Sequence, residues 1–217
     1  MTRPVLFDLD GTLVDSRAVV ERQWAALCAR LALDFPSVLS ILHGVRSVDV
    51  IRTVAPDVDA EMEAAALDAA EQEDTEGLEV VRGSRELLAR LPADGWGIVT
   101  SGHRTLAEGR LRAVGLPVPA VMVCGDEVAN GKPDPEGYVT GARRLGAAPA
   151  ACVVVEDAPA GIAAARAAGI PAIGITTTHP ASALAGAALV IADLTEFDAA
   201  IAALARGAPG EPGAKPR

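Results

Sequence analysis

The sequence predicts an α/β fold: a Rossmann-like, doubly wound parallel sheet with a small helical insertion after its first strand. Short apolar runs rich in β-branched residues alternate with helical patterns, which is typical of a parallel sheet covered on both faces. Residues 16–80 break this rhythm, because they carry helical patterns without a clear strand. A length of 217 residues is enough for one core domain with such an insertion.

Each element follows from a local pattern. Apolar runs predict strands at residues 5–9, 96–100, 120–124, 152–156, 172–175 and 189–192. Helical spacing of apolar residues between these strands predicts helices at residues 104–114, 136–145, 160–168 and 196–204. The same spacing within the insertion predicts helices at residues 17–31, 48–54 and 59–73. Ser84 is expected to cap one more helix, at residues 85–91.

These elements divide the chain into a core domain at residues 1–15 and 81–205 and a helical domain at residues 16–80. The Gly- and Pro-rich segment 206–217 predicts a disordered tail. A net charge of −10 without a basic stripe argues against a nucleic-acid partner. No apolar run approaches the roughly 18 residues of a membrane span. Three widely spaced cysteines predict reduced thiols and a cytoplasmic location.

Carboxylates follow two of the predicted strands, and they are the first indication of chemistry. Asp8 and Asp10 end the first strand, and Glu156 and Asp157 end the fourth. One such acid alone is ordinarily a helix cap or an exposed strand end. If the two strands are neighbours, however, all four acids converge at the edge where doubly wound sheets bind ligands. Alternation along the first strand would also point Asp8 and Asp10 the same way. Mg²⁺ would relieve their repulsion, because it prefers oxygen ligands.

Groups suited to an anion follow the other strands. Thr12 follows the first strand, and Thr100, Ser101 and Gly102 follow the second, just before a predicted helix whose free amides favour anions. A simple helix cap is the alternative for that segment. Lys132 lies in the loop GKPDP of a chain whose other lysine is Lys215. It is therefore a candidate for neutralising phosphate oxygens, and a solvated surface lysine is the alternative.

Together, these groups suit phosphoryl transfer. One carboxylate would attack phosphorus and form an aspartyl-phosphate that water then cleaves. A second carboxylate would protonate the leaving alcohol and later deprotonate the water. The metal ion and a lysine would stabilise charge on the phosphoryl oxygens.

Four motifs resemble those of the haloacid dehalogenase-like (HAD) superfamily, in the family's order and over nearly the whole chain. DLDGT is similar to its first motif, which implies that Asp8 is the nucleophile and Asp10 the general acid/base. The resemblance also implies that Asp8 binds Mg²⁺ through its side chain and Asp10 through its backbone carbonyl. The helical insertion matches the position of the family's C1 cap, which closes over the site and excludes water.

The other three motifs follow later strands. Thr100 in VTSG is similar to the second motif, and Lys132 in GKPDP is similar to the third. VVVEDAPAGI is similar to the fourth, which implies that Asp157 is a metal ligand with Glu156 beside it. The resemblance thus implies a C1-capped, Mg²⁺-dependent enzyme.

Further residues narrow the subfamily. The second aspartate of DLD argues against a dehalogenase, and the absence of lysine from residues 16–80 argues against a phosphonoacetaldehyde hydrolase and disfavours a β-phosphoglucomutase. HGVRS, which holds His43 and Arg46, and the TSGxR segment that ends at Arg104 resemble the glycerol-phosphate and 2-deoxyglucose-6-phosphate phosphatases. This resemblance implies that His43 and Arg46 face the substrate; a loop with an ordinary surface arginine is the alternative.

We therefore expect a phosphatase acting on a small sugar or polyol phosphate ester, as a monomer or weak homodimer. A phosphoglycolate-type or nucleotide phosphatase, a β-phosphoglucomutase-like phosphotransferase and a regulatory protein without activity are the alternatives. Asp15 and Ser16 are expected to form the hinge into the cap. His103 and His179 are expected to be structural or surface residues.

Overall fold

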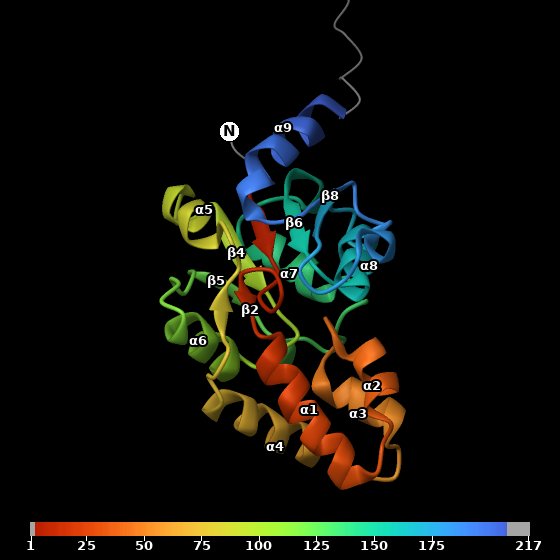
Figure 1. Cartoon of the computed structure of the whole chain (residues 1–217). Helices are drawn as coiled ribbons and strands as arrows, with labels where there is room; N and C mark the ends of the chain where they lie inside the picture. The colour runs from red at the N-terminus through yellow and green to blue at the C-terminus, as the bar shows by residue number, and fades with distance from the viewer. Residues whose placement is uncertain (1–2, 208–217) are drawn as a thin grey trace, which may run out of the picture.

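The computed structural model describes residues 3–207, and the predicted parallel sheet lies at its centre (Figure 1). The sheet has six strands, each parallel to its neighbours. In spatial order they are β5 (Val121–Val123), β4 (Trp96–Val99), β1 (Val5–Phe7), β6 (Val153–Glu156), β7 (Ala172–Ile175) and β8 (Leu189–Ile191). Every strand predicted from the sequence is present, which confirms the doubly wound α/β fold.

The strand order decides where a ligand can bind. From β1 the sheet grows through β4 to β5 on one side, and from β6 to β8 on the other. The winding therefore reverses next to β1, and this switch point is the usual ligand site of an open α/β sheet. β1 pairs directly with β6, as the convergence of the four acids requires.

β1 is shorter than predicted, because the chain turns immediately after the strand. The predicted strand extended to Leu9, whereas β1 ends at Phe7. The carbonyl of Leu9 accepts hydrogen bonds from the amides of residues 12–14, which closes a tight turn. The alternation argument that placed Asp8 and Asp10 on one side of a strand therefore does not apply to Asp10.

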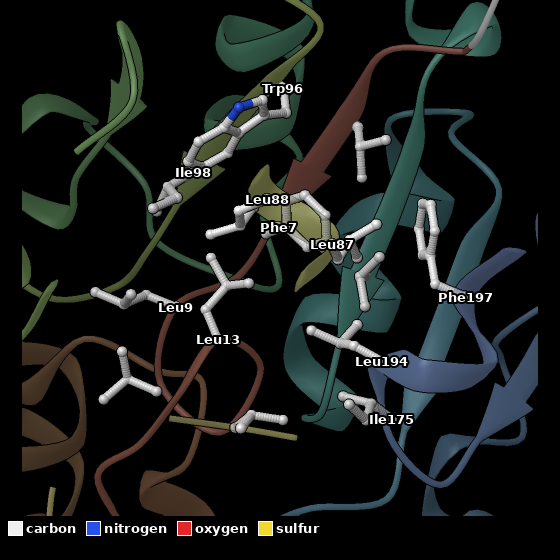
Figure 2. Close-up of a cluster of buried hydrophobic side chains, with 14 of the residues drawn as sticks. Phe7, Leu9, Leu13, Leu87, Leu88, Trp96, Ile98, Ile175, Leu194 and Phe197 are labelled. Atoms are coloured by element: carbon white, nitrogen blue, oxygen red, sulfur yellow. The ribbon is translucent and has the colours of Figure 1, made fainter. Parts of the chain in front are cut away.

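Helices cover both faces of the sheet. One face packs against α5 (Ser84–Arg90), α6 (Arg104–Ala113) and α9 (Phe197–Gly207). Phe7, Leu87 and Phe197 form part of a buried cluster there (Figure 2), to which Leu111 of α6 also belongs. The other face packs against α7 (Glu136–Arg144) and α8 (Pro159–Ala167). Side chains of β1 alternate between the two clusters, so the strand is buried on both faces. Short 3₁₀ helices occupy Gly125–Glu127, Pro149–Ala151, Ala181–Leu184 and Leu194–Glu196.

Two helix ends differ from the prediction. Ser84 is not the N-cap of α5 but its first residue, because its hydroxyl donates instead to the Leu13 carbonyl at 3.1 Å. Gly83 takes the cap position, with φ +87°. At the other end of the core, α9 continues to Gly207, so residues 206 and 207 are helical rather than part of a tail. The rest of the predicted tail, residues 208–217, lies outside the described residues.

Residues 16–80, which we call the cap, form helices around a hydrophobic cluster of their own (Figure 1). Trp24, Leu27, Ile51 and Leu67 are among its buried members. The helices are α1 (Arg17–Leu31), α2 (Phe35–Leu42), α3 (Ser47–Val54) and α4 (Ala60–Glu73). Helix α2 was not predicted, although the capping residue Asp34 and the proline that follows Phe35 are recognisable helix-start signals.

Two chain crossings connect the cap to the core, and they pair with each other. β2 (Val14–Asp15) and β3 (Glu79–Val80) form a two-stranded antiparallel ribbon. The expectation that residues 16–80 hold no strand is therefore wrong at β3. Within residues 3–207 no helix has the length and apolar character needed to cross a membrane.

Candidate active site

A buried ammonium joins two carboxylates where β1 and β6 end. Asp8 is 3% exposed and follows β1, and Glu156 is the last residue of β6. Lys132 donates from Nζ to Asp8 Oδ1 at 2.5 Å and to Glu156 Oε1 at 2.6 Å. Tyr138 donates its hydroxyl to the same Glu156 oxygen at 2.9 Å. The loop that holds Lys132 and the ends of the neighbouring strands β1 and β6 thus meet at one point.

The electrostatics of this cluster are uncompensated. Carboxylate oxygens of Asp8, Glu156 and Asp157 lie within 4.8 Å of one another. Burial, assisted by the charges of Glu156 and Asp10, raises the pKa of Asp8 to about 7. Burial and then the charges of Glu156 and Asp8 raise the pKa of Asp157 well above its ordinary value. Burial opposes the charged form of Lys132, but the two carboxylates raise its pKa overall. One ammonium therefore does not neutralise the cluster.

The donor set fits a hard divalent cation, because it consists of buried carboxylate oxygens with excess negative charge. The three acids are not equally available. Both oxygens of Glu156 already accept hydrogen bonds, Oε1 from Lys132 and Tyr138 and Oε2 from the Ala158 amide at 2.9 Å. Asp8 and Asp157 are consequently the better ligand candidates, with Glu156 orienting Lys132 beside them.

Two glycines allow these acids to approach so closely. A Cβ on Gly11 would lie 2.1 Å from Asp157 Oδ2, and Gly11 also has φ +80°, which favours glycine. A Cβ on Gly161 would lie 1.6 Å from Glu156 Oε1. The glycines of DLDGT and APAGI are therefore required by the packing of the acids behind them.

A cavity of about 70 Å³ lies between the core and the cap, next to this cluster. Asp8 and Asp10 line it together with the residues after β4, namely Thr100, Ser101 and Gly102. The Ser101 hydroxyl donates to the Gly44 carbonyl of the cap at 2.8 Å. The cavity is partly open, and contacts such as this one and the ion pair of Arg110 with Glu71 hold the cap against the core in this structure, an arrangement that we call closed.

The lining of this cavity lacks four of the residues expected to bind phosphate or substrate: Thr12, Arg46, Arg104 and Lys132. Lys132 is buried against Asp8, to which it donates. Thr12 is fully buried, and its hydroxyl lies 3.4 Å from Asp157 Oδ1. Arg104 is directed to Glu127 and to the Met122 carbonyl, which it reaches at 3.0 Å. Thr12 thus contacts the Asp157 carboxylate, and the partners of Arg104 lie outside the cavity.

The two cap residues of HGVRS occupy different places. His43 lines the cavity, whereas Arg46 lies in an adjacent groove that Lys132 also lines. The guanidinium of Arg46 donates to Asp49 at 2.6 Å and to the core carbonyl of Val128 at 3.1 Å. Arg46 therefore forms a hydrogen-bonded contact between the cap and the core in this structure.

His43 faces a second histidine across the boundary between cap and core. The rings of His43 and His179 are 5.8 Å apart in an edge-to-face arrangement. Burial, with the charge of His179 as the next cause, lowers the pKa of His43 to about 4. His179 Nδ1 lies 3.1 Å from the Asp157 carbonyl oxygen. His179, expected to be a structural or surface residue, therefore packs directly beside the acid cluster.

Asp10 belongs to a separate charge network. Its Oδ1 accepts a hydrogen bond from Ser16 at 2.8 Å and forms an ion pair with Arg110 Nη1 at 2.6 Å. Arg110 in turn pairs with Glu71 of α4, in the cap. Sequence reasoning missed both Arg110 and Glu71. A signal existed, because Arg110 shares the buried stripe of α6 with Leu106, an unusual position for a charge.

The cap wall of the cavity also carries an acid that was missed. Asp68 lies one turn before Glu71 on α4, and both line the cavity with Ser47 of α3. The Asp68 carboxylate lies 3.4 Å from the Ser47 hydroxyl and 3.3 Å from His103 Nδ1. Burial raises the pKa of Asp68. This wall therefore offers mainly hydrogen-bond acceptors to whatever enters.

Comparison with known proteins gives consistent matches. Residues 3–169 match the family model described as haloacid dehalogenase-like hydrolase. Hexitol phosphatase A of Escherichia coli (strain K12) is 42% identical over 78% of this chain and 81% of its own. 2-Deoxyglucose-6-phosphate phosphatase 1 of Saccharomyces cerevisiae is 38% identical over 88% of this chain and 87% of its own. A hydrolase from Pseudomonas syringae has a similar structure, with a TM-score of 0.84 at 25% identity over 94% of this chain and 99% of its own.

Proposed function

The chain belongs to the haloacid dehalogenase-like hydrolase family and is a phosphoric monoester hydrolase, and from this premise we propose that it is a Mg²⁺-dependent phosphatase of small sugar or polyol phosphates. In the proposed reaction Asp8 carries an aspartyl-phosphate intermediate. The observation that carries this proposal is the buried cluster of Asp8, Glu156 and Asp157 beside Lys132, in which Asp8 lines a cavity together with Asp10.

The first half of the proposed reaction is attack of an Asp8 carboxylate oxygen on phosphorus, as the bond from phosphorus to the ester oxygen breaks. Asp10 gives a proton to the leaving alcohol. Lys132 is held against Asp8 and would offer its ammonium to the phosphoryl oxygens as well. Thr100, Ser101 and Gly102 line the same cavity and supply a hydroxyl-rich wall for those oxygens.

The second half returns Asp8 to its resting form. Asp10, now ionised, takes a proton from a water molecule, which attacks phosphorus and releases inorganic phosphate. A bound Mg²⁺ would neutralise charge on the phosphoryl oxygens. Asp8 and Asp157 would hold it, with Glu156 beside them and the backbone of Asp10 as the ligand that the family resemblance implies.

The cap supports a sugar or polyol phosphate as the substrate class. Asp68 and Glu71 present carboxylate oxygens and Ser47 a hydroxyl, which suit the hydroxyl donors of a polyol. A substrate with a carboxylate in that place, such as phosphoglycolate, would meet like charge. Relatives named for hexitol and 2-deoxyglucose-6-phosphate phosphatase activity fit the same class. His43 is part of this substrate wall in our proposal.

The setting of the enzyme is also part of the proposal. We expect it to act in the cytoplasm, which agrees with three buried, unpaired cysteines: Cys28, Cys124 and Cys152. We expect the protein to be a monomer or weak homodimer. The molecule that we expect it to bind is the phosphate ester itself.

The direct test is a panel of phosphate esters assayed for phosphate release with Mg²⁺ and with EDTA. The panel should include glycerol phosphate, 2-deoxyglucose 6-phosphate, a hexitol phosphate, phosphoglycolate and a nucleotide. We expect Mg²⁺-dependent turnover that favours the sugar and polyol esters. A preference for phosphoglycolate or the nucleotide would contradict the substrate class, and turnover that EDTA leaves intact would contradict the metal requirement.

A further inference from the structure

We propose that Arg110 is a positioning residue that holds the proton-transfer group, Asp10, in its working orientation while the cap is closed. The inference rests on the proposed function, because it assigns a partner to the general acid/base of that reaction. It goes further by naming the atom of Asp10 left free to carry the proton and the cap residue that anchors the arrangement.

The geometry is that of a buried bridge between three elements. Arg110 projects from α6 and is 4% exposed. Its Nη1 lies 2.6 Å from Asp10 Oδ1, and its Nη2 pairs with Glu71, whose side chain is 5% exposed. Asp10 belongs to the turn after β1, and Glu71 to α4 of the cap. One guanidinium therefore ties the loop that carries the acid/base to the cap.

The bridge occupies one oxygen of Asp10 and leaves the other free. In the described part of the chain, both side chains that contact the Asp10 carboxylate do so at Oδ1: Arg110 as an ion pair and Ser16 as a hydrogen-bond donor. Ser16 is the hinge residue before α1, and its hydroxyl makes no capping bond to that helix. Two partners from different elements thus hold Oδ1 in place. Oδ2 is therefore the oxygen that carries the proton toward the ester oxygen.

A purely structural explanation accounts less well for this arrangement. Burying an arginine between core and cap carries a desolvation cost that apolar packing at the same boundary would avoid. The cost is greater here because Arg110 Nε is buried and has no hydrogen-bond partner among residues 3–207. A guanidinium is suited, however, to orienting a carboxylate, since its donors form a rigid planar fork.

The bridge also makes the orientation depend on the cap. When the cap opens, Glu71 leaves with α4 and Arg110 loses one of its two carboxylate partners. Asp10 then remains paired with Arg110, but Glu71 no longer holds Arg110 in position. The acid/base is consequently held in place in the closed state, in which the cap covers the cavity.

The test compares esters that differ in their need for a proton. An alkyl phosphate such as glycerol phosphate releases a poor leaving group that must be protonated, whereas p-nitrophenyl phosphate releases a stable phenolate. For Arg110→Gln we expect kcat/KM to fall by about 10–100-fold on glycerol phosphate, which is part of the roughly 10²–10⁴-fold of general acid catalysis because Asp10 itself remains, and by only a few-fold on p-nitrophenyl phosphate. Arg110→Lys should recover part of the loss.

Three further variants provide reference values for these losses in kcat/KM. Asp10→Asn should show the same dependence on the leaving group more strongly. Glu71→Gln should show it more weakly, and it keeps the test decisive if Arg110→Gln does not fold by circular dichroism. Arg112→Gln is the matched control, because Arg112 lies on the same helix but is 66% exposed and pairs with Glu108. It should leave both kcat/KM values unchanged.

The outcomes separate the inference from the proposed function. Equal losses on both esters in folded Arg110→Gln and Glu71→Gln would show a structural role and overturn the inference, as would no loss on either ester. If Asp10→Asn loses both esters equally while the wild type remains active, the general-acid role itself is wrong. A wild-type protein that hydrolyses neither ester with Mg²⁺ would contradict the proposed function.

Discussion

The two walls of the cavity are built differently. On the core side, Asp8 lines the cavity, and Lys132, Glu156 and Asp157 are packed around it; all four are at most 6% exposed, and Lys132 bonds to both Asp8 and Glu156. On the cap side, Glu71 is buried and paired with Arg110, but His43 and Asp68 are held less tightly. His43 meets His179 through ring packing, and Asp68 reaches its partners at 3.3 and 3.4 Å.

The difference indicates a division of labour. Groups locked into one geometry suit chemistry that is the same for every phosphate ester, because the phosphoryl group is common to all of them. Groups on a movable cap suit selection, since they meet the part of the substrate that varies. Changes in the core wall should therefore affect all esters equally, whereas changes in the cap wall should alter preference among them.

The largest effect is expected at the nucleophile. Asp8→Asn should lower kcat/KM by about 10⁴-fold or more on every ester, because it removes the attacking carboxylate. Asp94→Asn, at an exposed position of the core domain, is the matched control and should leave activity unchanged. An Asp8→Asn protein that loses one ester and keeps another would break the distinction between the two walls.

A smaller effect is expected at the metal site. Mg²⁺ should raise the Tm of the wild-type protein, because it binds the folded state. Asp157→Asn should weaken Mg²⁺ binding by about tenfold or more and reduce that Tm shift, as measured by calorimetry and thermal unfolding without substrate. Asp57→Asn, an exposed cap acid, should keep the full shift. An undiminished shift in Asp157→Asn would place the metal elsewhere.

Selectivity should change when the cap wall is altered. Asp68→Asn removes a negative charge and keeps the shape, so phosphoglycolate should gain about tenfold in kcat/KM relative to glycerol phosphate. The Mg²⁺ affinity of Asp68→Asn is the control, and it should equal that of the wild type. Equal effects on both esters would assign Asp68 to the structure of the cap rather than to selection.

The smallest expected effect is a pH dependence of stability from His43. Its pKa is lowered from 6.5 to about 4, so the unfolded chain binds a proton there below pH 6.5 and the folded chain binds it only near pH 4. Its contribution to stability is therefore lost as the pH falls from 6.5 to 4.

His43 is partly exposed, and solvent screening limits the effect to about 1 kcal/mol, or about 2–4 °C in Tm. Relative to His43→Gln, the wild type should lose Tm over this pH interval. A difference that stays constant with pH would contradict the lowered pKa.

The core wall could be predicted from the sequence much further than the cap wall. Asp8, Lys132 and Asp157 lie at the ends of apolar strands or in a rigid loop, so strand order alone brings them together. The charge network of Arg110 and Glu71 could not be predicted in this way. It joins helices of the cap and the core, and their relative placement depends on tertiary packing that no local pattern encodes.

Two smaller differences have local causes. The first strand stops at Phe7 because the Leu9 carbonyl closes a turn, which separates Asp10 from Asp8 and leads it to Arg110. Ser84 begins α5 instead of capping it, because its hydroxyl donates to Leu13. Both cases show a side chain or backbone group finding a long-range or turn partner that helix and strand patterns do not reveal.

The central claim is a covalent phosphoryl group on Asp8, and it can be observed directly. Asp10→Asn protein, in which hydrolysis of the intermediate is slowed, is mixed with Mg²⁺ and p-nitrophenyl phosphate, whose leaving group needs no proton, quenched in acid and digested for mass spectrometry. We expect the mass of one phosphoryl group on the peptide that contains Asp8, and no such mass on that peptide after Asp8→Asn is added to the variant. A phosphoryl group on another residue, or continued release of phosphate with no modified peptide, would contradict the account.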